Sequence, residues 1–297
     1  MIEVRNLSKT FDGFRALDGV TLTVPKGAVY GLVGPNGAGK STVIRHVTGI
    51  FRPDAGTVTV NGQPVYDNAE LRQTTAYIPD DVFYFPSATL KDMADFYGGI
   101  YRRFDRALYK ELLGIFSLDE NTALRRFSKG MQKQAAFLLA LCQRPELLVL
   151  DEPVDGLDPV MRRQVWSLLL QDVAQVGTTV LVSSHNLREL EDVCDHVGIM
   201  HKGKMMLERT LSELQDNVVK AQLVLKEGTQ LPEALPVLHR STVGKVETLI
   251  LRGSQDEIGA ALSALDPVFY DLIPLTLEEV FIYELGGVDY EVKSVIL

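Results

Sequence analysis

The chain has 297 residues, 46% of them hydrophobic, which suggests two globular domains with packed cores. Its net charge of −9 and isoelectric point near 5.1 argue against a broad electrostatic surface for nucleic acid or anionic lipid. The N-terminus lacks the basic and apolar regions of a signal peptide, and no apolar run is long enough to span a bilayer. We therefore expect a soluble chain whose membrane role, if it has one, comes through a partner.

Three β-forming segments lie near the N-terminus, at residues 2–6, 22–24 and 57–60. Their β-forming residues alternate or cluster between turn residues, which predicts an antiparallel element. The dipeptide Asn61-Gly62 is typical of a tight turn, so we expect it to close one hairpin.

A complete phosphate-binding loop, Gly34-Pro35-Asn36-Gly37-Ala38-Gly39-Lys40-Ser41, lies between an apolar strand at 29–33 and a helix that we expect to begin at Lys40. Its glycines let successive backbone N–H groups turn toward phosphate oxygens. Lys40 is expected to reach the β- and γ-phosphates, while the hydroxyl of Ser41 binds Mg²⁺. A plain glycine turn rarely matches every position of this pattern in this context. The loop therefore predicts a nucleoside triphosphate ligand.

A helical segment at 87–141 comes next, and Thr89 with Asp92 forms a predicted capping box at its start. Strand-like runs then return at 147–150, 179–183 and 197–200, separated by helices. This alternation predicts a parallel α/β core. The helix after the first of these strands is expected to begin at Asp158-Pro159 and to end at Gly177.

Two adjacent carboxylates, Asp151 and Glu152, end the strand at 147–150, and His185 follows the strand at 179–183. Open α/β sheets place ligands at this edge of their strands. We expect Asp151 to hold Mg²⁺, Glu152 to orient and polarise the attacking water, and His185 to lie near the γ-phosphate. Acidic residues at strand ends are common without a catalytic role, and the phosphate-binding loop is what favours one here. We interpret the remaining histidines as structural: His46, His196, His201 and His239.

The character of the sequence changes after Thr210. Strand-like runs occur at 218–225 and 248–252, and Thr276 with Glu279 is expected to cap a short helix that ends at Gly286-Gly287. We interpret this region as a small α+β appendage. The two cysteines, Cys142 and Cys194, lie in helix-like segments without metal-ligand spacing, which favours core packing in a reduced compartment.

The order of these motifs resembles that of the nucleotide-binding subunits of ABC transporters, and the resemblance covers about residues 1–212. Phe11 stands where that family stacks an aromatic ring on adenine, and Phe14 is the competing candidate. Asp80, within Tyr77-Ile78-Pro79-Asp80-Asp81, stands where the family usually has Gln, or Glu in some export branches. The shorter Asp side chain implies that a contact with Mg²⁺ needs a water bridge or a backbone shift.

Two further segments match the family at its dimer interface. Phe127-Ser128-Lys129-Gly130-Met131 is similar to the signature segment, usually Leu-Ser-Gly-Gly-Gln, which is directed at the γ-phosphate of the opposite subunit. Read alone, it is an ordinary serine-capped helix start. The segment 154–158 is similar to the loop that couples the two ATP sites, and Asp158 can also cap the following helix.

The resemblance implies an α/β fold with a P-loop NTPase core, an antiparallel β subdomain, a helical subdomain at about 86–144 and a small C-terminal α+β extension. The implied domains are an ABC ATPase domain at 1–212 and an accessory or regulatory domain at 213–297. The expected catalytic residues are Lys40, Glu152 and His185, and the expected metal ligands are Ser41, Asp80 and Asp151. The expected nucleotide-binding residues are Phe11, Gly34, Pro35, Asn36, Gly37, Ala38, Gly39, Lys40, Ser41, Thr42, Ser128, Gly130 and Asp158.

By this resemblance the chain is an ATPase that uses ATP and Mg²⁺, dimerises with a second ATPase subunit, identical or different, and drives an integral-membrane permease. Phe-Ser-Lys-Gly-Met and the tail Thr276-Leu277-Glu278-Glu279-Val280-Phe281 look like the bacterial export branch of the bacitracin-resistance and YtrB type. That branch implies export of peptide, antibiotic or lipid-like cargo and a cytoplasmic place at the inner face of the membrane. The alternative is a soluble ABC ATPase acting on ribosomes or DNA. We expect no nucleic-acid partner, because the chain is acidic and lacks the tandem ATPase domains, long coiled coils or zinc-binding cysteines of such proteins.

Overall fold

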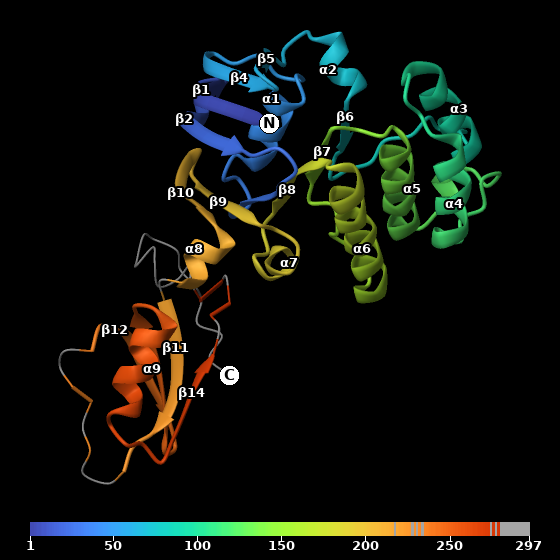
Figure 1. Cartoon of the computed structure of the whole chain (residues 1–297). Coiled ribbons are helices and arrows are strands. Elements are labelled where there is room, and N and C mark those ends of the chain that lie inside the picture. Colours follow the sequence, from blue (N-terminus) through green and yellow to red (C-terminus); the bar gives the residue numbers. More distant parts are fainter. Residues whose placement is uncertain are drawn as a thin grey trace. The chain divides into compact units, whose positions relative to one another are not determined.

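A six-stranded sheet forms the centre of the first part of the chain, in the order β10-β9-β3-β8-β7-β6 (Figure 1). Its strands are β3 (Val29–Val33), β6 (Thr75–Ile78), β7 (Leu147–Asp151), β8 (Thr179–Ser184), β9 (His196–His201) and β10 (Lys204–Thr210). The pairs β9–β3, β3–β8, β8–β7 and β7–β6 are parallel. All residues of β3, β7 and β8 are buried, as expected for strands covered on both faces. The prediction of a parallel α/β core is confirmed.

An antiparallel sheet in the order β2-β1-β4-β5 packs beside this core. Its strands are β1 (Ile2–Phe11), β2 (Phe14–Val24), β4 (Ala55–Val60) and β5 (Gln63–Pro64). Asn61 and Gly62 join β4 to β5 with φ values of 50° and 74°, the two positive angles that a tight hairpin turn needs. One hydrophobic cluster includes Val4 of β1, Leu22 of β2 and Leu32 of β3, so this sheet and the central sheet share a core.

Helices complete the first part of the chain. They are α1 (Lys40–Val47), α2 (Ala69–Gln73), α3 (Leu90–Ile100), α4 (Arg106–Phe116), α5 (Lys129–Cys142), α6 (Pro159–Val176) and α7 (Arg188–Glu191), with a 3₁₀ turn at Leu124–Arg126. Figure 1 shows α3, α4 and α5 grouped together beside β6 and β7. Thr89 and Asp92 form the predicted capping box of α3, and Gly177 ends α6 with φ 79°.

A second compact unit begins at Arg209, whereas residues 1–208 form the first. Its elements are α8 (Leu211–Asp216), β11 (Val218–Val224), β12 (Val237–Val243), β13 (Val246–Arg252), α9 (Gln255–Ser263) and β14 (Phe269–Ile273). The strands form one antiparallel sheet in the order β12-β13-β11-β14. Leu223, Leu249 and Leu262 belong to a separate hydrophobic cluster. The second unit therefore has a core of its own.

This computed structural model describes residues 1–279 except 217, 227, 228, 230, 233, 234, 274 and 277. The N–H of Glu279 donates to the hydroxyl of Thr276 at 3.2 Å, the bond expected of a helix cap, while the predicted end of that helix at Gly286-Gly287 lies outside the described residues. Both cysteines are buried and unbonded to each other. Within the described residues, we find no helix with the length and apolar character needed to cross a membrane.

Candidate active site

The phosphate-binding loop at 34–41 connects β3 to α1, as the sequence predicts. Gly37 and Gly39 have φ values of 82° and 104°, which side chains rarely adopt. A Cβ at Gly34 would lie 2.3 Å from the main-chain oxygen of Met200, so glycine alone fits there without a shift. A Cβ at Gly37 would meet nothing within 4 Å. The loop is therefore closed on its inner side and open at Gly37.

Lys40 is a buried lysine, only 5% exposed, at the start of α1. Its ammonium donates to the main-chain oxygens of Gly34 at 2.6 Å and Pro35 at 3.4 Å, and it lies 3.3 Å from Oε1 of Glu152. A buried ammonium requires such partners, because its desolvation is costly. The loop therefore holds a positive charge at its centre.

Ser41 and Asp151 meet beside this charge. The Ser41 hydroxyl donates to Oδ1 of Asp151 at 3.1 Å, and the Ser183 hydroxyl donates to the same oxygen at 2.6 Å. Asp151 is 3% exposed at the end of β7. A hydroxyl and a carboxylate are oxygen donors of the kind that Mg²⁺ prefers, so Ser41 and Asp151 suit a magnesium ion at the loop.

Glu152 lies between Lys40 and His185. Its Oε1 faces the Lys40 ammonium, whereas its Oε2 is 2.9 Å from Nδ1 of His185 and accepts the His185 main-chain N–H at 3.2 Å. The backbone of Glu152 has φ 46°, an uncommon value for a residue other than glycine. Its N–H donates to the Ser183 hydroxyl at 3.1 Å, and its C=O accepts from Lys133 at 2.8 Å. The carboxylate is thus fixed next to the loop.

An open cavity of about 360 Å³ lies over the loop. Its walls are formed by Phe11, Phe14, Ala16, Asn36, Gly37, Ala38, Gly39, Lys40, Ser41, Thr42, Asp80 and Glu152. Phe11 packs against Phe51, with ring centroids 5.3 Å apart, whereas Phe14 is 69% exposed. Both rings border the cavity, so both remain candidates for stacking on a base.

Asp80 follows β6 and borders the same cavity. Its carboxylate is 3.7 Å from the Lys133 ammonium. Partial burial raises the pKa of Asp80 above its ordinary value, and the nearby carboxylates Asp81, Asp151 and Asp155 act in the same direction against Lys133. Asp80 therefore lies near Asp151, an expected magnesium ligand, and forms an ion pair with Lys133.

The remaining expected residues do not line this cavity in the part of the chain that the structure describes. Ser128 caps α5 by accepting from the Met131 N–H at 3.2 Å, and Asp158 caps α6 by accepting from two N–H groups at 2.9 and 3.0 Å. A Cβ at Gly130 would lie 3.5 Å from Leu157, so the signature segment and the loop before α6 are neighbours. The capping alternatives for Ser128 and Asp158 are confirmed. Capping leaves an interface role open.

Sequence reasoning missed Ser183 and Lys133. Ser183 is a polar residue within the fully buried strand β8. Because a buried hydroxyl needs a hydrogen-bond partner, its place in an apolar run could have indicated a role in the site. Lys133 could not have been identified in this way, because a lysine near the start of a helix is ordinarily exposed and nothing in the sequence marks this one as buried. Both residues bind the main chain of Glu152.

Comparisons with known proteins identify the family of this chain. The family model described as "ABC transporter" matches residues 17–155. The ABC transporter ATP-binding protein YtrB of Bacillus subtilis (strain 168) is 33% identical over 290 residues, covering 97% of this chain and 99% of YtrB. The Nod factor export ATP-binding protein I of Burkholderia lata is 31% identical and covers 96% of this chain and 97% of its own.

A solved structure of an ATP-binding subunit of an ABC transporter is 31% identical and has a TM-score of 0.67, covering 72% of this chain and 92% of that one. The chain therefore belongs to the ABC transporter family and is one of its ATP-binding, ATP-hydrolysing subunits.

Proposed function

We propose that this subunit closes as a dimer around Mg²⁺-ATP, hydrolyses it, reopens and thereby drives a separate integral-membrane permease. The observation that carries the proposal is the Glu152 carboxylate, held 3.3 Å from Lys40 and 2.9 Å from His185 beside the phosphate-binding loop. A carboxylate at this place can accept a proton from an attacking water while a cation and a histidine contact the phosphate.

The phosphate-binding residues have distinct roles in this proposal. The main-chain N–H groups of residues 36–42 hold the β- and γ-phosphates, and Lys40 exchanges its main-chain partners for phosphate oxygens. Ser41 and Asp151 hold Mg²⁺, with Asp80 at the edge of the site. The ion supplies positive charge that stabilises the charge on the transferred phosphoryl group. Phe11 or Phe14 stacks on adenine.

The proposed dimer completes each site with Ser128, Gly130 and Asp158 of the second subunit. ABC cassettes dimerise as a family. Gly130 lies beside Leu157, the residue before Asp158, and none of the three residues lines the cavity of its own chain. The exposed Ser128 at the N-terminus of α5 suits an anion, because the N–H groups and helix dipole there are positive. The second subunit is another copy or a related ATPase.

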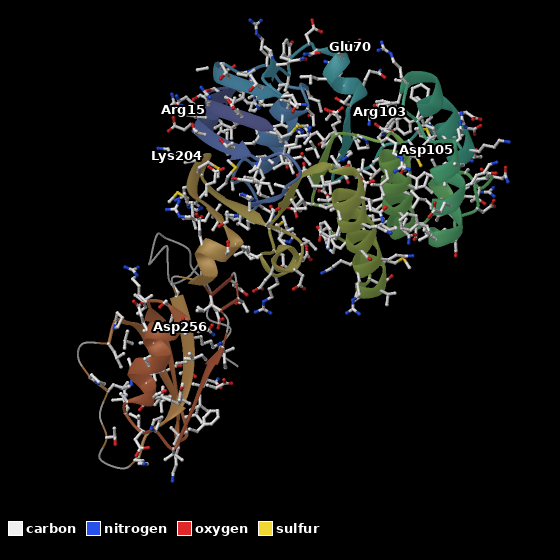
Figure 2. All side chains as sticks on the ribbon, in the orientation of Figure 1. Arg15, Glu70, Arg103, Asp105, Lys204 and Asp256 are labelled. Atoms are coloured by element: carbon white, nitrogen blue, oxygen red, sulfur yellow. The ribbon has the colours of Figure 1, made fainter. Side chains whose placement is uncertain are left out.

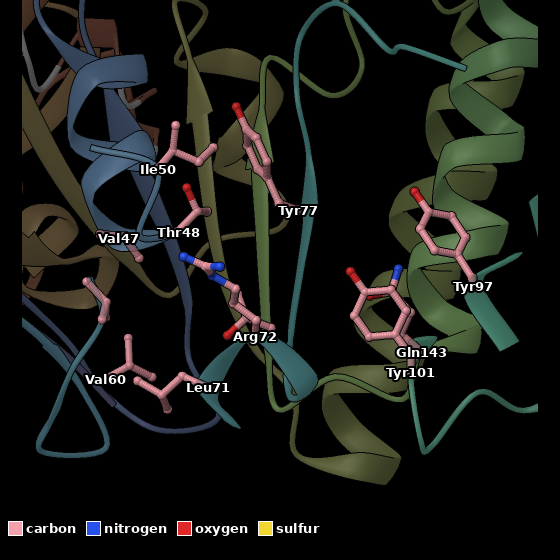
Figure 3. Close-up of a pocket in the computed structure, with 12 residues that line it drawn as sticks. Val47, Thr48, Ile50, Val60, Leu71, Arg72, Tyr77, Tyr97, Tyr101 and Gln143 are labelled. Carbon is pink, nitrogen blue, oxygen red and sulfur yellow. The ribbon is translucent and has the colours of Figure 1, made fainter. Parts of the chain in front are cut away.

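The proposed permease docks on a groove between the end of α1 and α3. The groove has a volume of about 280 Å³, and Figure 3 shows Ile50 and Thr48 on one side, Tyr97 and Tyr101 on the other and Tyr77 of β6 between them. Phe83 and Phe85, in the segment after Asp80, are 78% and 49% exposed. Exposed aromatic residues near a groove are typical of protein interfaces. This contact would place the chain at the inner face of the membrane through its partner.

The proposed direction of transport is export, of peptide, antibiotic or lipid-like cargo. The names of relatives support it, since one is a Nod factor export protein and another, from Streptomyces peucetius, is a daunorubicin/doxorubicin resistance protein. Co-purification from the native host in detergent tests the partner: a polytopic membrane protein is expected. Recovery of ribosomal or DNA-repair proteins instead would favour the soluble ATPase alternative.

Glu152→Gln tests the catalytic assignment. The amide keeps the shape of the side chain but cannot take a proton, so ATP turnover should fall by about a hundredfold or more. ATP binding should persist, and an ATP-dependent dimer should accumulate and be visible by light scattering. Glu111→Gln, on the exposed face of α4, is the matched control and should leave turnover unchanged. Normal turnover by the Glu152 variant would remove this residue from the proposed role.

A further inference from the structure

Lys133 is a charged residue held almost entirely inside the protein. It lies on α5, and its side chain is 10% exposed. The ammonium donates to the main-chain oxygen of Glu152 at 2.8 Å and lies 3.7 Å from the carboxylate of Asp80. One side chain therefore contacts both the catalytic segment after β7 and the segment after β6.

The main chain of Glu152, which accepts this hydrogen bond, has an uncommon conformation. Its φ of 46° directs the carboxylate toward Lys40 and His185, and such a conformation is costly unless the surroundings hold it. Two side chains do so, since the Ser183 hydroxyl accepts from the N–H and Lys133 donates to the C=O. Of these two, Lys133 comes from the helical subdomain.

The segment after β6 contacts two consecutive residues of α5, Gln132 and Lys133. Asp80 faces Lys133, and the hydroxyl of Tyr84 donates to the main-chain oxygen of Gln132 at 2.6 Å. Tyr84 is followed by the exposed Phe85, so the attached segment continues to the surface. A displacement of this segment relative to α5 would change what faces the Lys133 ammonium.

We propose that Lys133 is a positioning residue for Glu152 and that it transmits the position of the segment 80–85 to the catalytic carboxylate. This inference rests on the proposed role of Glu152 in hydrolysis. The Lys133 ammonium binds the main chain of Glu152, and Lys133 is not among the residues that line the nucleotide cavity in the described structure. Lys133 therefore acts through Glu152 and not by direct contact with the nucleotide.

Lys133→Met in the full chain tests the positioning role. It removes the donor to the Glu152 carbonyl, so kcat should fall about tenfold or more, while the Kd for ATP stays within about twofold. Lys133→Gln, too short to bridge the same groups, should give the same result if the methionine variant folds poorly. Lys133→Arg should restore much of kcat, because it keeps a long cationic donor. Lys110→Met, at an exposed position of α4, is the control.

Combination with Glu152→Gln separates this inference from the proposed function. If Lys133 acts through Glu152, Lys133→Met should not reduce the residual rate of the Glu152→Gln variant further. If Lys133→Met lowers the rate of the Glu152→Gln variant by the same factor as it lowers the wild-type rate, the inference is overturned. Unchanged kcat in the Lys133→Met single variant would also overturn it. So would a loss of ATP binding that accompanies the loss of kcat and that Lys133→Arg does not restore. Full turnover by Glu152→Gln alone would instead contradict the proposed function.

The transmission is tested by Tyr84→Phe, which removes the hydroxyl that attaches the segment to α5. The variant should lower kcat about threefold or more in the wild-type background and have no effect in the Lys133→Met background. An effect of the same size in both backgrounds would show that the segment does not act through Lys133.

Discussion

His46 is a buried histidine at the end of the helix that begins at the phosphate-binding loop. It is 0% exposed, its Nδ1 lies 2.7 Å from the main-chain oxygen of Thr42, and its Nε2 is buried without a hydrogen bond. Burial lowers its pKa below the ordinary value, and the nearby Lys9 charge acts in the same direction, whereas the hydrogen bond to the Thr42 main-chain oxygen and the Asp54 charge oppose this shift. The neutral ring is therefore the form that the fold accommodates.

This burial predicts a pH dependence of stability. The unfolded chain takes up a proton at a higher pH than the folded chain, so the free energy of unfolding should fall as pH drops below the ordinary histidine pKa. One such group contributes up to about 1.4 kcal/mol per pH unit, until pH also passes the folded pKa. Urea denaturation between pH 8 and pH 5.5 measures this slope. His46→Phe, which cannot titrate, should show a smaller slope, and equal slopes would exclude His46 as the source.

Asp105 connects α4 to the end of α5. Its carboxylate caps α4 by accepting from Ala107 and Leu108 at 2.9 Å, and it also accepts from Arg144 at 2.9 and 3.0 Å. The cap to Leu108, together with Arg144, holds the pKa of Asp105 below its ordinary value. Figure 2 labels this residue within the helical group. One side chain thus fixes two helix ends.

Asp105→Ala should lower the free energy of unfolding by about 1–2 kcal/mol, because it removes a helix cap and a partly buried ion pair. Asp105→Asn keeps a capping oxygen and should cost less. Arg102→Ala breaks an exposed pair with Glu70 and is the control, with an expected effect of about 0.5 kcal/mol or less. Chemical denaturation gives all three values, and equal effects of the Asp105→Ala and Arg102→Ala changes would show that the cap is unimportant.

The elements that sequence analysis predicted are those with local signals. The loop at 34–41, the turn Asn61-Gly62 and the caps Thr89 and Asp158 are each defined by neighbouring residues. β12 escaped prediction because all seven of its residues are exposed, so no hydrophobic alternation marks it.

The contacts of Lys133 and Ser183 with Glu152 were not predicted from the sequence, for another reason. Lys133 is 19 residues away and Ser183 is 31 residues away, and only the folded sheet and α5 bring them together. The residues that we propose for catalysis were therefore predictable from their motifs, whereas the residues that contact the main chain of Glu152 were not.

The two compact units have separate hydrophobic clusters, one including Leu32 and Ile44 and the other including Leu223 and Leu249. All residues assigned to ATP lie in the first unit. We propose that residues 1–212 are the ATPase domain and that 213–297 form an accessory domain that helps to hold the dimer or regulates it. Because each unit has its own hydrophobic cluster, we expect the first unit to fold without the second.

A chain that ends after Ser212 tests this proposal. It should fold and bind ATP like the full chain, because its core and nucleotide cavity remain complete. In the Glu152→Gln background, where ATP-bound dimers accumulate, its dimer should be about tenfold weaker, equivalent to about 1.4 kcal/mol. Light scattering over a range of concentrations measures this difference against the full chain with the same substitution. Dimerisation and turnover equal to those of the full chain would exclude both proposed roles, and an unfolded product would show that the first core depends on the second.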